Sequence, residues 1–123
     1  MRGPKASQVN LIVEFKQVLE KIVRCYTNPY WLVLRAKIIL YAAMGASNSE
    51  IAQRVDTTRD TAREWRERWL EAEPRLLTAA AEGLDEKDLT ELVKTVLSDA
   101  YRSGAPNIFA AEQLAKMLGA PER

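Results

Sequence analysis

The stretch from Asn48 to Trp69, NSEIAQRVDTTRDTAREWRERW, constrains the fold of this chain more than any other part of it. Small and apolar side chains recur in it three and four positions apart, which makes them neighbours on one face of a helix. The pattern stops near residue 56 and then resumes, so the stretch predicts two helices joined by a short turn. The inward-facing side chains are Ile51, Ala52 and Val55 in the first helix and Thr58, Ala62, Trp65 and Trp69 in the second.

The turn between these two helices spans Asp56 to Thr58. Thr58 suits the N-cap of the second helix, because its hydroxyl can accept a hydrogen bond from a free backbone N–H. Ala52 is small enough for the helices to touch, and Asp56 can adopt the left-handed backbone of the turn, although glycine would do so more easily. This arrangement is a helix-turn-helix, whose second helix can lie in a DNA major groove.

Length and composition indicate one soluble globular domain, or one domain with a tail. With 47% hydrophobic and 28% charged residues, the chain has the composition of neither a disordered nor a membrane protein. No apolar run approaches the roughly 18 residues of a membrane span, and the start, MRGPKASQ, lacks the apolar core of a signal peptide. We therefore expect a cytoplasmic protein with no membrane partner.

Cys25 is the only cysteine, and the chain has no histidine. An internal disulfide, a zinc site built from cysteine and histidine, and histidine-based catalysis are therefore excluded. We expect no cofactor, no metal site and no small-molecule substrate. Cys25 itself is expected to be a small buried side chain.

Charge is distributed unevenly along the chain. Residues 1–75 hold 13 lysines and arginines against 9 acidic residues, a balance of +4, while residues 76–123 hold 5 against 8, a balance of −3. The basic part contains the helix-turn-helix, as expected if that part meets phosphate.

The remaining segments predict an all-α fold, with a trihelical helix-turn-helix core of the homeodomain or paired-like kind and additional C-terminal helices. Residues 1–6 are expected to form a flexible basic arm, residues 7–73 the helix-turn-helix domain, residues 74–101 C-terminal helices that pack on it or extend it, and residues 102–123 a linker with a short terminal helix. Outside the motif, the expected helices cover residues 8–26, 29–44, 75–82, 85–100 and 109–118.

Capping and helix-breaking residues set these boundaries. Ser7 suits the N-cap of the first helix, and Asn28 and Pro29 end that helix and start the second, with Pro29 at the first helical position. Pro74 is expected to interrupt the recognition helix and to open a new one. Asp85 suits the N-cap of the helix that follows.

The second expected helix, residues 29–44, is apolar almost all round, with Arg35 and Lys37 as its only charged side chains. A helix without a polar face is normally central, so this one is expected to form the core. Part of its apolar surface could equally serve a homodimer interface, and the sequence leaves the two uses open.

Two runs of sequence resemble the N-terminal DNA-binding region of bacterial mariner-like transposases, the insertion sequence 630 family. They are PYWLVLRAKIILYAAMGASNSEIAQRVDTTRDTAREWRERWLEAEPRL and VLSDAYRSGAPNIFAAEQLAKM. The matching positions are Arg35 and Lys37 before the motif, Ile51, Ala52 and Val55 in its first helix, Thr58, Arg59, Asp60, Thr61, Arg63 and Trp65 in its recognition helix, and Arg102, Ser103, Gly104 and Pro106 in the linker.

This resemblance implies that the helix-turn-helix of a bacterial protein binds the terminal inverted repeats of a transposable element. In that family a second helix-turn-helix and a catalytic domain with three metal-binding carboxylates follow, so we expect this chain to be the DNA-binding module without the catalytic domain, and not an enzyme. The chain departs from the family pattern at Asp56, where glycine is usual, and at Thr57, Ala62 and Ala110.

The residues expected to contact DNA lie in the turn, along the recognition helix and in the linker. At 100° per residue the recognition helix carries a basic stripe beside its core face and an acidic stripe, Asp60, Glu64 and Glu67, opposite that face. The expected contact residues are Thr57, Thr58, Arg59, Asp60, Arg63, Glu64, Arg66 and Arg102.

Two interpretations of these charges follow. Arg59 or Arg63 can bind guanine O6 and N7 while Asp60 or Glu64 accepts from a cytosine amino group, which gives sequence-specific binding of double-stranded DNA. Arg102 would then enter a minor groove.

The alternative is a solvated helix with ion pairs between Glu64 and Arg68 and between Asp60 and Arg63. The protein would then be an interaction or dimerisation module with weak or no DNA binding.

Overall fold

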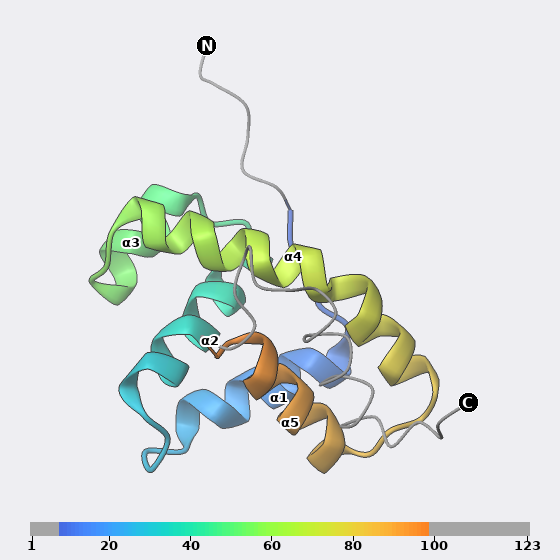
Figure 1. Cartoon of the computed structure of the whole chain (residues 1–123). Helices are drawn as coiled ribbons and strands as arrows, with labels where there is room; N and C mark the ends of the chain where they lie inside the picture. The colour runs from blue at the N-terminus through green and yellow to red at the C-terminus, as the bar shows by residue number, and fades with distance from the viewer. Residues whose placement is uncertain (1–7, 99–123) are drawn as a thin grey trace.

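The computed structural model of the chain describes residues 8–98. The predictions for the basic arm, Ser7, the linker with Arg102 and the terminal helix lie outside the described residues. The described part is all-α, as predicted, and contains no strand. Its helices are α1 (Val13–Arg24), α2 (Tyr30–Ala43), α3 (Asn48–Val55), α4 (Arg59–Ala81) and α5 (Glu86–Val96), arranged as Figure 1 shows.

Helix α1 is shorter at both ends than the sequence predicts. Ile12 is its N-cap, with extended backbone, and Val9 before it is fully buried without being helical. At the other end, the Asn28 side chain donates from Nδ2 to the carbonyl oxygen of Ile22 at 3.0 Å. Asn28 therefore closes α1 and does not cap α2, and Pro29 is the N-cap of α2 instead of its first helical residue.

The loop between α1 and α2 exposes two side chains: Cys25, which was predicted to be buried, and Tyr26, which was predicted to end the first helix. Tyr26 is 94% exposed, and Cys25 is exposed as well. Both predictions were wrong because α1 ends at Arg24, so its buried stripe does not extend into the loop. Cys25 Sγ lies 3.1 Å from Thr27 Oγ1, and this hydrogen bond lowers the pKa of the thiol.

Helix α2 is central, as predicted: it contacts α1, α3 and α4. The core forms where these helices meet α5. At its centre the rings of Trp69 and Phe15 meet edge to face, with centroids 6.1 Å apart. Burial of each large apolar side chain stabilises the fold by about 1.5–3 kcal/mol. The largest fully buried side chains include Trp69, Phe15, Leu19, Ile38, Ile39, Ile51, Leu76, Leu92 and Leu97.

Helix α4 runs through Pro74 without a break, contrary to the prediction that a new helix would start there. Proline has no N–H to donate to the carbonyl of Leu70, which normally ends or kinks a helix. The buried stripe of α4 nevertheless continues past the proline with Leu76 and Ala79. Their burial offsets the lost hydrogen bond, so residues 75–81 extend the recognition helix.

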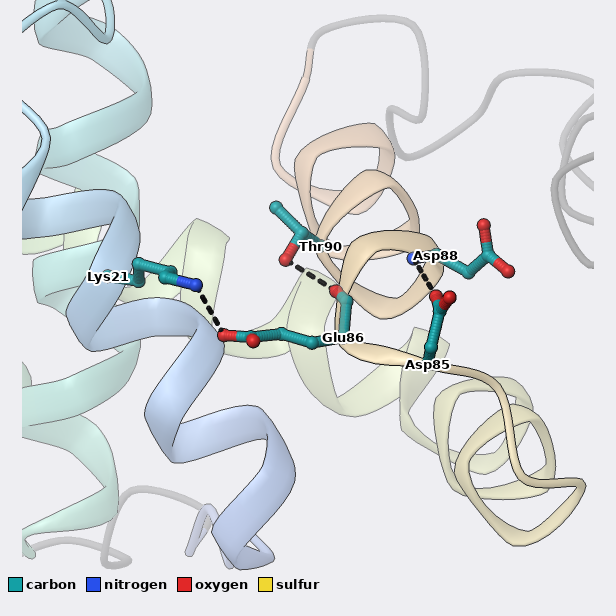
Figure 2. A network of polar contacts seen from close by, with 5 residues as sticks. All are labelled: Lys21, Asp85, Glu86, Asp88 and Thr90. Atoms are coloured by element: carbon teal, nitrogen blue, oxygen red, sulfur yellow. Dashed lines mark hydrogen bonds and ion pairs between the residues drawn. The ribbon is translucent and has the colours of Figure 1, made fainter.

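Helix α5 packs on α1 and α4 through its apolar face. Asp85 is its N-cap, as predicted, and accepts a hydrogen bond from the Asp88 N–H at 2.9 Å. Lys21 of α1 donates to Glu86 at 2.8 Å, and Figure 2 shows this pair beside the cap. Both side chains of the pair are more than half exposed, so it contributes at most about 1 kcal/mol. The apolar residues that hold α5 in place are Leu89, Leu92, Val93 and Val96.

Within the described range, none of the helices combines the length and the apolar composition that crossing a bilayer requires.

Replacing Pro74 by alanine is expected to stabilise the protein. A proline in a helix interior costs about 3 kcal/mol relative to alanine. Part of the gain is lost because alanine leaves the unfolded chain freer, by about 1 kcal/mol. Urea denaturation of Pro74→Ala should therefore show a free energy of unfolding about 2 kcal/mol above wild type. Glu71→Ala, at an exposed site on the same helix, is the control and should change it little. A less stable Pro74→Ala variant would contradict this account of α4.

Candidate nucleic-acid interface

The start of α3 is held by a reciprocal pair of hydrogen bonds between Ser47 and Glu50. The Ser47 hydroxyl accepts from the Glu50 N–H at 3.1 Å, and the Glu50 carboxylate accepts from the Ser47 N–H at 2.8 Å. This capping box satisfies two backbone donors that a helix end otherwise leaves free. It determines where the first helix of the motif begins.

The turn after α3 has the geometry predicted for residues 56–58. Asp56 adopts the left-handed conformation, with φ 58° and ψ 56°, and the Thr57 N–H donates to the Ala52 carbonyl at 2.9 Å. Thr58 is the N-cap of α4, since its hydroxyl oxygen accepts from the Thr61 N–H at 3.0 Å. The recognition helix therefore starts with Arg59 at its first position.

The inward face of α4 carries Trp65 and Trp69, both buried as predicted. The Trp65 ring lies between two guanidinium groups, with Arg35 at 4.1 Å and Arg68 at 4.3 Å from its centroid. Arg35 also donates to the carbonyl of Leu97 at 2.9 Å. Arg35, which the family resemblance matches, thus connects α2 with α4 and with the end of α5.

Arg66 is 3% exposed, although it was predicted to contact DNA. Its Nη1 donates to Asn48 Oδ1 at 2.6 Å and its Nη2 to the Ala46 carbonyl at 2.7 Å. Desolvation by burial lowers the pKa of Arg66. The sequence signal for this position is its spacing, four residues after Ala62 and three before Trp69, which places Arg66 at the edge of the core stripe.

The other predicted contact residues on α4 are at the surface. Arg59, Asp60, Arg63 and Glu64 are exposed, as is Thr58 before them, and Thr57 is half-buried. Arg102 lies outside the described residues. The structure therefore brings six of the eight predicted residues together at the turn and the first two turns of α4. Their role in DNA binding stays a prediction.

Both predicted ion pairs are present on the same helix. Arg63 lies 3.7 Å from Asp60, with both side chains well exposed, so this pair is weak and can open. Arg68 pairs with Glu64 and is itself buried. Glu64 therefore compensates the buried charge of Arg68, whereas Asp60 leaves the guanidinium of Arg63 exposed to solvent.

The exposed outer face of α4 is acidic, because the structure places Arg66 and Arg68 inside. From residue 59 to residue 71 this face exposes two arginines and four carboxylates, a balance of −2. The arginines lie in the first two turns, and three of the carboxylates follow them toward the C-terminus. We call Glu64, Glu67 and Glu71 the acidic ridge; they line one surface hollow with Asp60, Arg63 and Arg68.

Two polar residues near the turn were missed by the sequence analysis. Gln53 and Arg54 are exposed at the end of α3, with the Arg54 guanidinium 5.6 Å from the centroid of the Tyr41 ring. Their positions outside the stripe of Ile51 and Val55 are the signal that could have identified them. They add one cation beside the turn.

Residues 34–73 match a family model described as a helix-turn-helix domain. This range takes in the second half of α2, all of α3 and the first part of α4. No curated protein and no solved structure matches the chain. In residues 34–73 the chain is therefore similar to helix-turn-helix domains, a kind of domain that indicates DNA binding in general and is typically non-catalytic.

Glycine at position 56 is expected to stabilise the turn. A non-glycine residue with left-handed backbone costs about 1–2 kcal/mol, and glycine avoids this cost but has more freedom to lose on folding. Urea denaturation of Asp56→Gly should give a free energy of unfolding about 0.5–1 kcal/mol above wild type.

Two further variants check that the gain comes from the backbone conformation. Gln53→Gly, at an exposed site inside α3, should lose about 1 kcal/mol. Asp56→Val should lose stability, because a β-branched residue does not tolerate this conformation. A loss of stability in Asp56→Gly would mean that the Asp56 carboxylate itself stabilises the turn.

Proposed function

We propose that this protein binds double-stranded DNA sequence-specifically by placing the first two turns of α4 in the major groove. The observation that carries the proposal is the N-terminal end of α4, where the turn at Asp56 and the Thr58 cap leave Arg59 and Arg63 exposed one helical turn apart. Recognition helices of this motif contact base edges with their N-terminal residues. The match of residues 34–73 to a helix-turn-helix domain supports the same conclusion.

The chemistry of this end suits both phosphate and bases. The N-terminus of a helix carries a partial positive charge and free N–H groups, which favour a nearby phosphate. Thr57 and Thr58 supply hydroxyls at the same place. Arg59 and Arg63 can each bind guanine O6 and N7, while Asp60 can accept from the amino group of cytosine.

The acidic ridge restricts how DNA can lie on α4. Its carboxylates repel phosphates, so the contact is confined to the first two turns and does not extend along the helix. Few cations are available there: Arg59, Arg63 and Arg54. Base contacts must then contribute a large share of the affinity, which favours a reader of specific sequence over a general DNA-coating protein.

The resemblance to mariner-like transposases supports a narrower assignment. We propose that the target is a terminal inverted repeat, and that the protein acts as a non-catalytic DNA-binding module in the cytoplasm of a bacterium. Such binding requires no cofactor.

The first test is DNA affinity as a function of salt, using fluorescent duplexes selected by the protein from a randomised pool. Log K should fall linearly with log salt with a slope of about −2 to −3, since each neutralised phosphate contributes about −0.9. Arg63→Ala and Arg59→Ala should each weaken binding by about tenfold or more, because a bidentate arginine–guanine contact is worth about 1–3 kcal/mol.

Arg24→Ala is the matched control, because Arg24 is exposed at the end of α1, a helix whose packing partners are α2 and α5. It should bind as wild type does. If the wild-type protein selects no duplex and binds none at low salt, the proposal fails. If Arg59→Ala and Arg63→Ala both bind normally, the contact lies elsewhere.

Neutralising the far part of the acidic ridge should strengthen binding. Glu67→Gln and Glu71→Gln are each expected to raise the affinity about twofold, since each removes one charge that repels phosphate from about 10 Å away. Glu64 is left unchanged because it pairs with the buried Arg68. Glu91→Gln, exposed on α5, is the control and should have no effect. A lower affinity of Glu67→Gln or Glu71→Gln would show that these carboxylates contact the DNA.

A second candidate function is self-association, which one observation favours. An apolar groove of about 510 Å³ opens between α1 and α2, with Met44 exposed at its edge and Leu11, Val23 and Leu40 in its lining. Light scattering across a concentration series distinguishes a dimer from a monomer. A dimer that binds no duplex would favour this second function over the first.

A further inference from the structure

The buried guanidinium of Arg66 connects the recognition helix with the segment that leads into α3. Its two Nη atoms donate to the Ala46 carbonyl and to Asn48 Oδ1, at 2.7 and 2.6 Å. These acceptors lie on either side of Ser47, the N-cap of α3. One side chain of α4 is thus hydrogen-bonded to the residue before the N-cap of α3 and to the residue after it.

Burying the charged guanidinium of Arg66 costs free energy that an apolar side chain at the same place would not cost. Among the described residues no carboxylate pairs with Arg66, and its Nε is buried without a hydrogen-bond partner. Burying a charge in this way usually stabilises a protein less than an apolar side chain of similar volume. Burial also lowers the pKa of the group, which shows the same desolvation.

The hydrogen bonds of a guanidinium fix the orientation of the groups that they join, which apolar contacts do not. Arginine presents its N–H groups in a rigid planar fork, so two acceptors at fixed places determine the orientation of the whole group. Here both acceptors belong to a segment of three residues, and the capping box of Ser47 and Glu50 holds that segment. The position of α3 relative to α4 is therefore set by hydrogen bonds as well as by packing.

We propose that Arg66 is a positioning residue for DNA binding: it contacts no DNA, and its hydrogen bonds to Ala46 and Asn48 hold α3 and the turn in the orientation that presents Arg59 and Arg63 to the groove. This inference rests on the proposed function. It assigns Arg66 a role different from the direct contact that the sequence predicted.

A double-mutant cycle with the selected duplex tests the role of Arg66. Asn48→Ala should weaken binding about threefold and Arg66→Met about tenfold, because the first variant loses one of the two hydrogen bonds of the guanidinium and the second loses both. The double variant should bind no more weakly than Arg66→Met alone, because both changes remove the same interaction. Arg66→Lys, with one ammonium group in place of the fork, should lie between wild type and Arg66→Met.

The control for stability is Val93→Ala, a core change on α5, a helix that packs against α1 and α4. Measured at a temperature where every variant is folded by circular dichroism, it should bind as wild type does. Equal loss of affinity in Val93→Ala and Arg66→Met would overturn the proposal, and so would additive effects of Asn48→Ala and Arg66→Met or normal binding by Arg66→Met.

Two results separate the possible failures. If Arg66→Met does not fold, Asn48→Ala and Arg66→Lys decide the question, because normal binding by both would overturn the positioning role. If the wild-type protein binds no duplex, the proposed function fails. If wild type binds and the Arg66 variants bind equally well, only this inference fails.

Discussion

The burial of one face of α4 is the interaction on which the rest of the structure depends. That face carries Trp65 and Trp69 in its first half and Leu76 in its second. The same helix is therefore the second helix of the helix-turn-helix at its N-terminal end and part of the hydrophobic core at its C-terminal end. Trp69 meets Phe15 of α1 edge to face, and α2, α3 and α5 all contact the same helix. The position of the N-terminal end of α4, where Arg59 and Arg63 are exposed, therefore depends on the burial of this face.

The arginines of this region fall into two groups with different physical tasks. Arg59 and Arg63 are exposed, whereas Arg66 and Arg68 are buried beside the core. Within residues 8–98, three donors of the interior group have no hydrogen-bond partner, namely Nε of Arg66 and Nε and Nη1 of Arg68. A buried donor without a hydrogen-bond partner lowers the stability of the fold. The presence of the interior arginines is therefore explained by the contacts that they do make, with Ala46, Asn48 and Trp65. A count of basic residues along the helix therefore overstates the positive charge that DNA would meet.

Much of the fold could be predicted because it depends on interactions between residues close together in the chain. The left-handed turn at Asp56, the caps at Thr58 and Asp85 and the inward stripe with Trp65 and Trp69 all involve residues at most five positions apart. The match of residues 34–73 to a helix-turn-helix domain agrees with that local pattern. The predicted surface location of Arg59, Asp60, Arg63 and Glu64 was also confirmed, because these positions lie away from a well-defined stripe.

The sequence by itself determined the two helices of the motif, the caps at Thr58 and Asp85 and the packing face of the motif, since periodicity and capping are short-range. Only the tertiary structure decided which side chains at the edge of that face are covered. Arg66 is buried because the segment at Ala46 and Asn48 lies over it, and α4 continues through Pro74 because the core buries Leu76 beyond it. Each of these outcomes depends on another element of the fold, and local periodicity does not contain that information.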